Sequence, residues 1–176
     1  MHDPAKIDKP LIRVIDDDDA MRNSWAFLIE GEGWDVKTYA DAITFLSSND
    51  YIRPGCLLLD VRMPHMSGLE LQLKLREAGC DLPIIFISGH GDIDMAVNTL
   101  KAGAIDFLQK PVDDQRLLKT IENAVSHNLA QRRGKREVTD FRNRLESLTQ
   151  REREVIRMVA HCLLYTSDAA DDGESV

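Results

Sequence analysis

The sequence predicts an α/β protein: a doubly wound, five-stranded parallel sheet, followed by a helical linker and an incomplete helical domain. Five short apolar runs alternate along the chain with five amphipathic segments. Runs such as 56–60 and 83–88 lack the polar–apolar alternation of a half-exposed strand, so they fit strands buried on both faces. This order of strands and helices favours right-handed crossovers with helices on both faces of the sheet.

The elements follow in order from residue 11. The first strand is 11–15, and the helix after it, 20–31, is expected to start at the acids Asp18 and Asp19 and to stop at Gly31. The remaining expected elements are a strand at 34–39, a helix capped by Asp41, a strand at 56–60, a helix at 67–78, a strand at 83–88, a helix at 92–102 capped by Asp92, a strand at 104–109 and a long helix from 113.

Length and composition fit one full domain and part of another. The chain has 176 residues, 43% of them hydrophobic and 30% charged. Its apolar runs are shorter than the roughly 18 residues of a membrane span, and its N-terminus has no secretory apolar region, so a cytoplasmic protein without a membrane partner is expected. Three widely spaced cysteines without a CxxC motif predict neither a disulfide framework nor a zinc site.

Charge divides the chain. Residues 1–130 carry 13 Lys and Arg against 21 Asp and Glu, whereas residues 131–161 carry nine against five. The acidic part is therefore a poor candidate for binding nucleic acid. The basic stretch fits either a solvated linker helix or a nucleic-acid contact.

Polar side chains follow the expected strands where each one ends. These are Asp16 and Asp17 after the first strand, Asp60 after the third, Ser88 after the fourth and Lys110 after the fifth. In doubly wound sheets, ligands bind at the carboxyl ends of the strands. Two carboxylates about 4 Å apart repel by about 4 kcal/mol at an effective dielectric of 20, so a compensating cation is expected. Mg²⁺ is the natural candidate, with Lys110 supplying further positive charge.

Four segments together resemble one family. Residues 14–18 (VIDDD), 59–68 (LDVRMPHMSG), 87–92 (ISGHGD) and 107–111 (FLQKP) are similar to the motifs of receiver domains of two-component response regulators, most closely the FixJ-like members. The resemblance covers about residues 10–130 and implies a flavodoxin-like receiver with strand order 2-1-3-4-5. It also implies a switch protein that promotes only its own phosphorylation and dephosphorylation, and is not otherwise an enzyme.

The resemblance assigns roles to the residues at the strand ends. Asp60 would be the phosphoacceptor, receiving a phosphoryl group from a sensor histidine kinase or a small acyl phosphate. Lys110 would pair with a phosphoryl oxygen, and Ser88 would donate a hydrogen bond to another. Mg²⁺ would be held by Asp17, Asp60 and the backbone carbonyl of Arg62, with Asp16 helping through a water. The family pattern also allows a cis peptide bond between Lys110 and Pro111.

The switch would involve Ser88 and Phe107. In this family the hydroxyl moves toward the phosphoryl group, and the aromatic residue on the fifth strand turns inward behind it. The surface that rearranges, formed by the fourth helix and fifth strand at about 92–109, would mediate homodimerisation on phosphorylation. A plain core role for Phe107 is the alternative.

The C-terminal part is expected to be an interrupted output module. Residues 131–144 read as a helical linker, and 145–161 resemble the opening helix of a LuxR-type helix-turn-helix domain, with Thr149 and Glu152 spaced as a capping box. The recognition helix is absent, so no residue of this chain is expected to bind DNA specifically, and promoter DNA would be a partner only of a complete protein. Residues 162–176 depart from that family and are expected to be an artefact of a truncated gene or a disordered tail.

The prediction is therefore a phosphoacceptor receiver of a transcriptional response regulator, and two rivals remain. One is a stand-alone receiver that regulates a protein partner. The other is a haloacid-dehalogenase-type phosphatase, which places a second Asp two residues after its nucleophile. Here that position is Arg62, which counts against the phosphatase.

Overall fold

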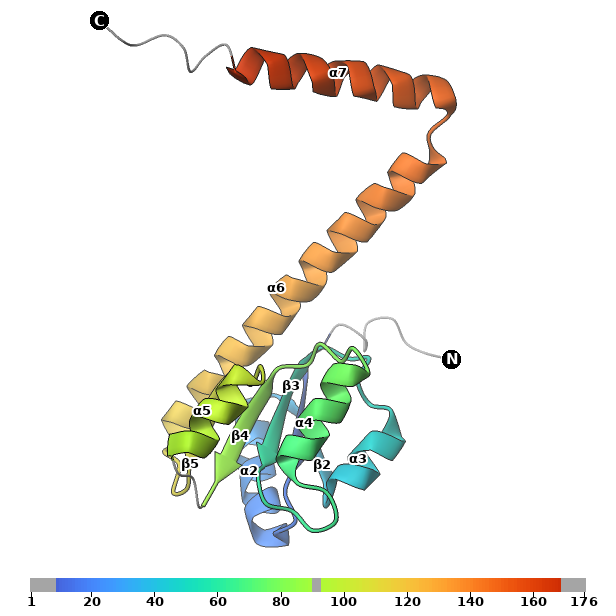
Figure 1. Ribbon diagram of the computed structural model, residues 1–176. Coiled ribbons are helices and arrows are strands. Elements are labelled where there is room, and N and C mark those ends of the chain that lie inside the picture. The colour runs from blue at the N-terminus through green and yellow to red at the C-terminus, as the bar shows by residue number, and fades with distance from the viewer. Residues whose placement is uncertain (1–8, 90–92, 169–176) are drawn as a thin grey trace, which may run out of the picture. The chain divides into compact units, whose positions relative to one another are not determined.

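The computed structural model describes residues 9–89 and 93–168. Its parallel sheet has the strand order β2-β1-β3-β4-β5, which confirms the predicted topology (Figure 1). The strands are β1 (Leu11–Ile15), β2 (Asp35–Tyr39), β3 (Gly55–Asp60), β4 (Ile84–Ser88) and β5 (Asp106–Gln109). The helices are α2 (Asp19–Gly31), α3 (Ala42–Ser48), α4 (Gly68–Glu77), α5 (Ile93–Lys101), α6 (Asp114–Ser147) and α7 (Gln150–Asp168).

Helices cover both faces of the sheet, as two separate hydrophobic clusters show. On one face Ile12, Val14 and Leu58 pack with residues of α2 and the first part of α6, such as Trp25 and Ile121. On the other face residues of β1, β3 and β4 pack with α3, α4 and partly buried Met95 of α5. Every residue of β1, β3 and β4 is buried, which explains why their sequences lack alternation.

Helix starts follow the local capping chemistry. The Asp18 side chain accepts hydrogen bonds from the backbone N–H groups of Ala20 and Met21 and caps α2, and Asp41 caps α3 through Thr44. Both caps are confirmed predictions. The expected cap at Asp92 lies outside the described residues.

The fifth strand begins later than the sequence predicts. Gly103 has φ +100°, and the backbone N–H of Ala104 donates to the Thr99 carbonyl at the end of α5. The turn therefore includes Ala104, the first residue of the strand expected at 104–109. Ile105 still donates to Ile84, but the regular ladder starts at Asp106.

The chain divides into two compact units, one ending at Arg132 and the other beginning at Arg133. Helix α6 runs unbroken through the expected linker 131–144. In the second unit, the Thr149 hydroxyl accepts from the Glu152 backbone N–H at 3.4 Å, and the Glu152 carboxylate accepts from the Thr149 backbone N–H at 2.8 Å. The predicted capping box therefore starts α7, whose helix continues to Asp168. Within the described residues, no helix is both long and apolar enough to cross a membrane.

Arg132 anchors α6 to the first unit at the edge opposite the carboxyl ends of the strands. Its guanidinium donates to the Asp81 carboxylate, with Nε at 3.1 Å, and to the carbonyls of Tyr51 and Ile52. The side chain is only 16% exposed. It therefore joins two loops to one helix.

Arg132→Ala is expected to lower the free energy of unfolding of the first unit by about 1–2 kcal/mol, because a charged donor and its partly buried acceptors lose one another. The matched control is Arg133→Ala, at an exposed neighbour, which is expected to stay within about 0.5 kcal/mol. Urea titration followed by circular dichroism measures both, and equal effects of the two changes would contradict the anchor.

Candidate phosphoacceptor site

Three predicted site residues meet at the carboxyl edge of the sheet. Because Ile15 and Leu59 are register partners in neighbouring strands, Asp16 and Asp60 emerge side by side. The Lys110 ammonium lies 3.0 Å from Asp16 Oδ2 and 3.1 Å from Asp60 Oδ1. The structure therefore brings together Asp16, Asp60 and Lys110.

Burial sets the electrostatics of this acid–acid–lysine cluster. Asp16 and Asp60 are only 3% and 8% exposed. Burial raises the pKa of Asp60, and the charge of Asp16 adds to this, while the attraction of Lys110 offsets only part of it. Burial alone would lower the pKa of Lys110, but its hydrogen bonds to Asp16 and Asp60 and their charges outweigh burial and raise that pKa. These environments therefore favour the charged form of Lys110 and disfavour the ionised form of Asp60 relative to an exposed carboxyl group.

Ser88 and Phe107 lie on the two strands beside the cluster. Ser88 ends β4, is buried, and its carbonyl accepts from the Lys110 backbone N–H at 2.8 Å. Phe107 on β5 is half-buried and packs against the hydrophobic cluster beneath α3, α4 and α5. The Lys110–Pro111 peptide bond is cis, as the family resemblance allows.

Asp17 and the Arg62 side chain stay outside the buried cluster. Both are exposed, and Asp17 makes no hydrogen bond or ion pair with other residues in the described part of the chain. Arg62 contacts the cluster through its backbone instead, because its backbone N–H donates a hydrogen bond to Asp60 Oδ2 at 2.8 Å.

The oxygen donors at this edge fit Mg²⁺ by their chemistry. Asp16, Asp17 and Asp60 offer hard carboxylate oxygens, and Mg²⁺ commonly binds through one or two carboxylates together with waters. Across residues 9–89 and 93–168, no three His, Cys, Asp or Glu side chains already form a metal-binding group. Of these three carboxylates, Asp17 is the one with no hydrogen bond or ion pair among residues 9–89 and 93–168, so it is the most available to a cation.

Sequence reasoning gave no role to two residues that shape this site. Gly68 begins α4 directly against β3, where a Cβ atom would lie 2.3 Å from the Asp60 carbonyl oxygen. Arg22 on α2 donates to the Asp16 carbonyl at 2.7 Å. Two signals were available in the sequence. Gly68 follows Ser67, whose side chain caps α4, and Arg22 comes one turn into a helix that begins with acids.

Known proteins similar in sequence or structure include response regulators and a transcriptional regulatory protein. The sequence profile of the response regulator receiver domain matches residues 12–122. Response regulator protein TmoT of Ectopseudomonas mendocina is 42% identical over 161 residues, which cover 92% of this chain and 73% of TmoT. Transcriptional regulatory protein FixJ of Rhizobium meliloti is 39% identical over 160 residues, covering 91% of this chain and 78% of FixJ. The solved structure of response regulator StyR is 42% identical with a TM-score of 0.78, covering 95% of this chain and 84% of StyR.

Proposed function

This chain belongs to the response regulator receiver family and to its FixJ-like two-component regulators, and from that membership we propose that Asp60 is its phosphoacceptor. The observation that carries the proposal is a buried carboxylate at the end of β3 with a lysine ammonium 3.1 Å away and a second acid beside it. A carboxylate oxygen of Asp60 attacks the phosphorus of a phosphohistidine on a sensor kinase, or of an acyl phosphate. The bond to the leaving group breaks, and the leaving group keeps the electron pair.

The neighbours of Asp60 divide the remaining work. Lys110 favours the ionised carboxylate before transfer and neutralises a phosphoryl oxygen after it. Asp16, Asp17, Asp60 and the Arg62 carbonyl would hold Mg²⁺, which supplies charge neutralisation for the transferring group. The buried Ser88 hydroxyl donates to a phosphoryl oxygen once it turns toward Asp60.

The output of the switch is proposed to be transcriptional. The similarity to FixJ, a transcriptional regulatory protein, supports this. Residues 10–130 form the receiver, 131–144 the linker and 145–161 the start of a helix-turn-helix domain. Phosphorylation, read by Ser88 and Phe107, favours a homodimer through α5 and β5, and promoter DNA is a partner of a complete protein only.

The test is to map the phosphoryl group on the unchanged protein. Incubation with acetyl phosphate and MgCl₂ is expected to add one phosphoryl group by intact-protein mass spectrometry, and EDTA should prevent this. Hydroxylamine should remove the group, as expected of an acyl phosphate, and peptide mapping after borohydride reduction should place it on Asp60. A stable phosphate on another residue would refute the assignment.

A further inference from the structure

Arg22 reaches back from α2 to the turn that carries the acidic residues. One guanidinium nitrogen donates to the backbone carbonyl of Asp16 at 2.7 Å, and the other pairs with the Asp19 carboxylate. The Arg22 side chain is only 13% exposed, although Asp19 beside it is 81% exposed. Its bond to the carbonyl is thus a partly buried, charge-assisted hydrogen bond, the stronger class of such contacts.

The turn between β1 and α2 is closed by hydrogen bonds on both sides of Asp17. The Asp18 backbone N–H donates to Asp16 Oδ1 at 2.9 Å, and the Asp18 side chain caps α2. Arg22 holds the carbonyl of Asp16, which belongs to the peptide plane that joins Asp16 to Asp17. The direction in which Asp17 leaves the backbone therefore depends on a plane that Arg22 fixes.

Resting on the proposed function, we propose that Arg22 is a positioning residue for phosphoryl transfer, which holds the Asp16–Asp17 peptide so that both carboxylates are oriented for a divalent cation. It touches neither the phosphoryl group nor the cation. Its action passes through the Asp16 carbonyl to the side chain of Asp17.

The sign of the effect on Mg²⁺ affinity separates positioning from simple charge. A cation close to a group of carboxylates weakens their attraction for Mg²⁺, so removing the charge of Arg22 would tighten Mg²⁺ binding if charge were all that mattered. Loss of a residue that orients metal ligands weakens metal binding instead, typically by 10–100-fold. The two accounts predict opposite changes in one dissociation constant.

The experiment measures the Mg²⁺ dissociation constant of the full, unphosphorylated chain by titrating MgCl₂ and following tryptophan fluorescence. Arg22→Met keeps the stem and removes both donors, and it is expected to weaken Mg²⁺ binding about tenfold. Arg22→Lys keeps the positive charge but cannot form both guanidinium contacts at once. Its Mg²⁺ dissociation constant should lie between that of Arg22→Met and that of the parent chain. The matched control, Asp19→Asn, breaks the exposed ion pair but leaves the carbonyl bond, and should change the constant less than about twofold.

Phosphorylation kinetics give the second measurement. In Arg22→Met the Mg²⁺ concentration needed for half-maximal labelling by acetyl phosphate should rise about tenfold, while the KM for acetyl phosphate stays unchanged at saturating Mg²⁺. An unchanged or smaller Mg²⁺ dissociation constant in Arg22→Met would overturn the proposal.

Circular dichroism checks that the variants fold. If Arg22→Met does not fold, the Mg²⁺ dissociation constant of Arg22→Lys decides on the same criterion. Failure of the proposed function shows differently, because the unchanged chain itself then takes up no phosphoryl group on Asp60.

Discussion

The Asp60→Asn variant is expected to take up no phosphoryl group from acetyl phosphate and, at neutral pH, to be more stable than the parent chain. The amide has no anionic oxygen to attack phosphorus, so labelling should be lost completely. The gain in stability arises because the ionised Asp60 carboxylate is buried beside Asp16, and Lys110 offsets only part of that cost.

The pH dependence of this gain follows from the direction of the pKa shift. The folded-state pKa of Asp60 is raised above its usual 3.8, so the folded state binds the proton more tightly than the unfolded state does. The parent chain therefore gains stability from Asp60 as the pH falls from above the raised pKa to below 3.8. The advantage of Asp60→Asn should accordingly be greatest at neutral pH and shrink in acid.

Thermal unfolding across this pH range, with mass spectrometry of the same samples, measures both effects. A rise in Tm of about 2–4 °C at pH 7 would correspond to a gain near 1 kcal/mol in a chain of this size. Asp140→Asn, at an exposed acid on α6, serves as the control and should change neither quantity. Residual labelling in Asp60→Asn, or a lower Tm at pH 7, would contradict the account given for the cluster.

The cluster was predictable because its geometry follows from topology. Parallel strands end at one edge of a sheet, so the residues at or directly after the ends of β1, β3 and β5 had to come near one another once the order of elements was known. Asp16, Asp60 and Lys110 do so. The helix caps at Asp18 and Asp41 were predictable for a similar reason, since each bond spans only two or three residues.

The contacts that were not predicted depend on backbone geometry or on partners far along the chain. Gly68 is needed because α4 begins against the Asp60 carbonyl, and the motif 59–68 contains this glycine without showing what it contacts. Arg13 lies in an apolar strand sequence, and its acidic partner Asp50 comes 37 residues later, from the loop after α3. The partner of a charged residue inside a buried strand becomes known only from the folded structure, which shows which distant residue pairs with it.

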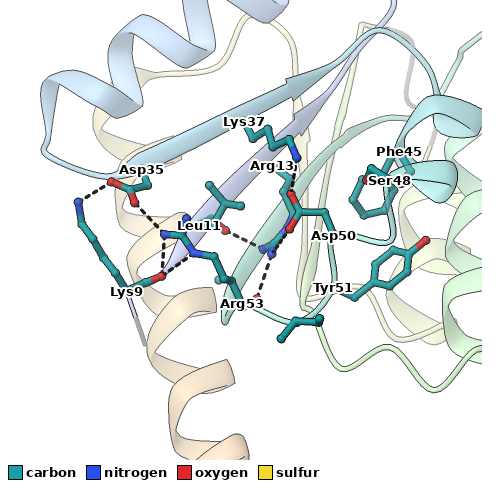
Figure 2. A network of polar contacts seen from close by, with 12 residues as sticks. Lys9, Leu11, Arg13, Asp35, Lys37, Phe45, Ser48, Asp50, Tyr51 and Arg53 are labelled. Carbon is teal, nitrogen blue, oxygen red and sulfur yellow. Dashed lines mark hydrogen bonds and ion pairs between the residues drawn. The ribbon is translucent and has the colours of Figure 1, made fainter. Parts of the chain in front are cut away.

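Asp50→Ala is expected to be the most destabilising of these changes, lowering the free energy of unfolding by about 3–5 kcal/mol because it leaves a buried charge unpaired. Arg13 is fully buried, and it donates to the carbonyls of Leu11 and Arg53 and pairs with Asp50 at 3.4 Å (Figure 2). Its Nε has no partner, and Asp50 forms its only ion pair within the described residues.

Asp50 is also held by donors from β2. Burial raises its pKa, but the Tyr39 hydroxyl at 2.8 Å, the Lys37 ammonium at 3.1 Å and the charge of Arg13 together outweigh burial and lower it. Stability contributed by this carboxylate is present above its usual pKa of 3.8 and is lost as the pH falls through the lowered value. The difference between Asp50→Ala and the parent should therefore be full at pH 7 and diminish in strong acid.

Two companion variants make the Asp50 prediction specific. Arg13→Met should cost less than Asp50→Ala, because it leaves Asp50 with Lys37 and Tyr39, and an apolar side chain suits the buried strand. Asp35→Ala breaks the neighbouring, more exposed pairs with Lys9 and Arg53 and should cost no more than about 1 kcal/mol. Urea unfolding of the three variants at pH 7 ranks them. If Asp50→Ala were no worse than Asp35→Ala, the buried Arg13 charge would have to be satisfied by the two backbone carbonyls alone, and its ion pair with Asp50 would contribute nothing to the fold.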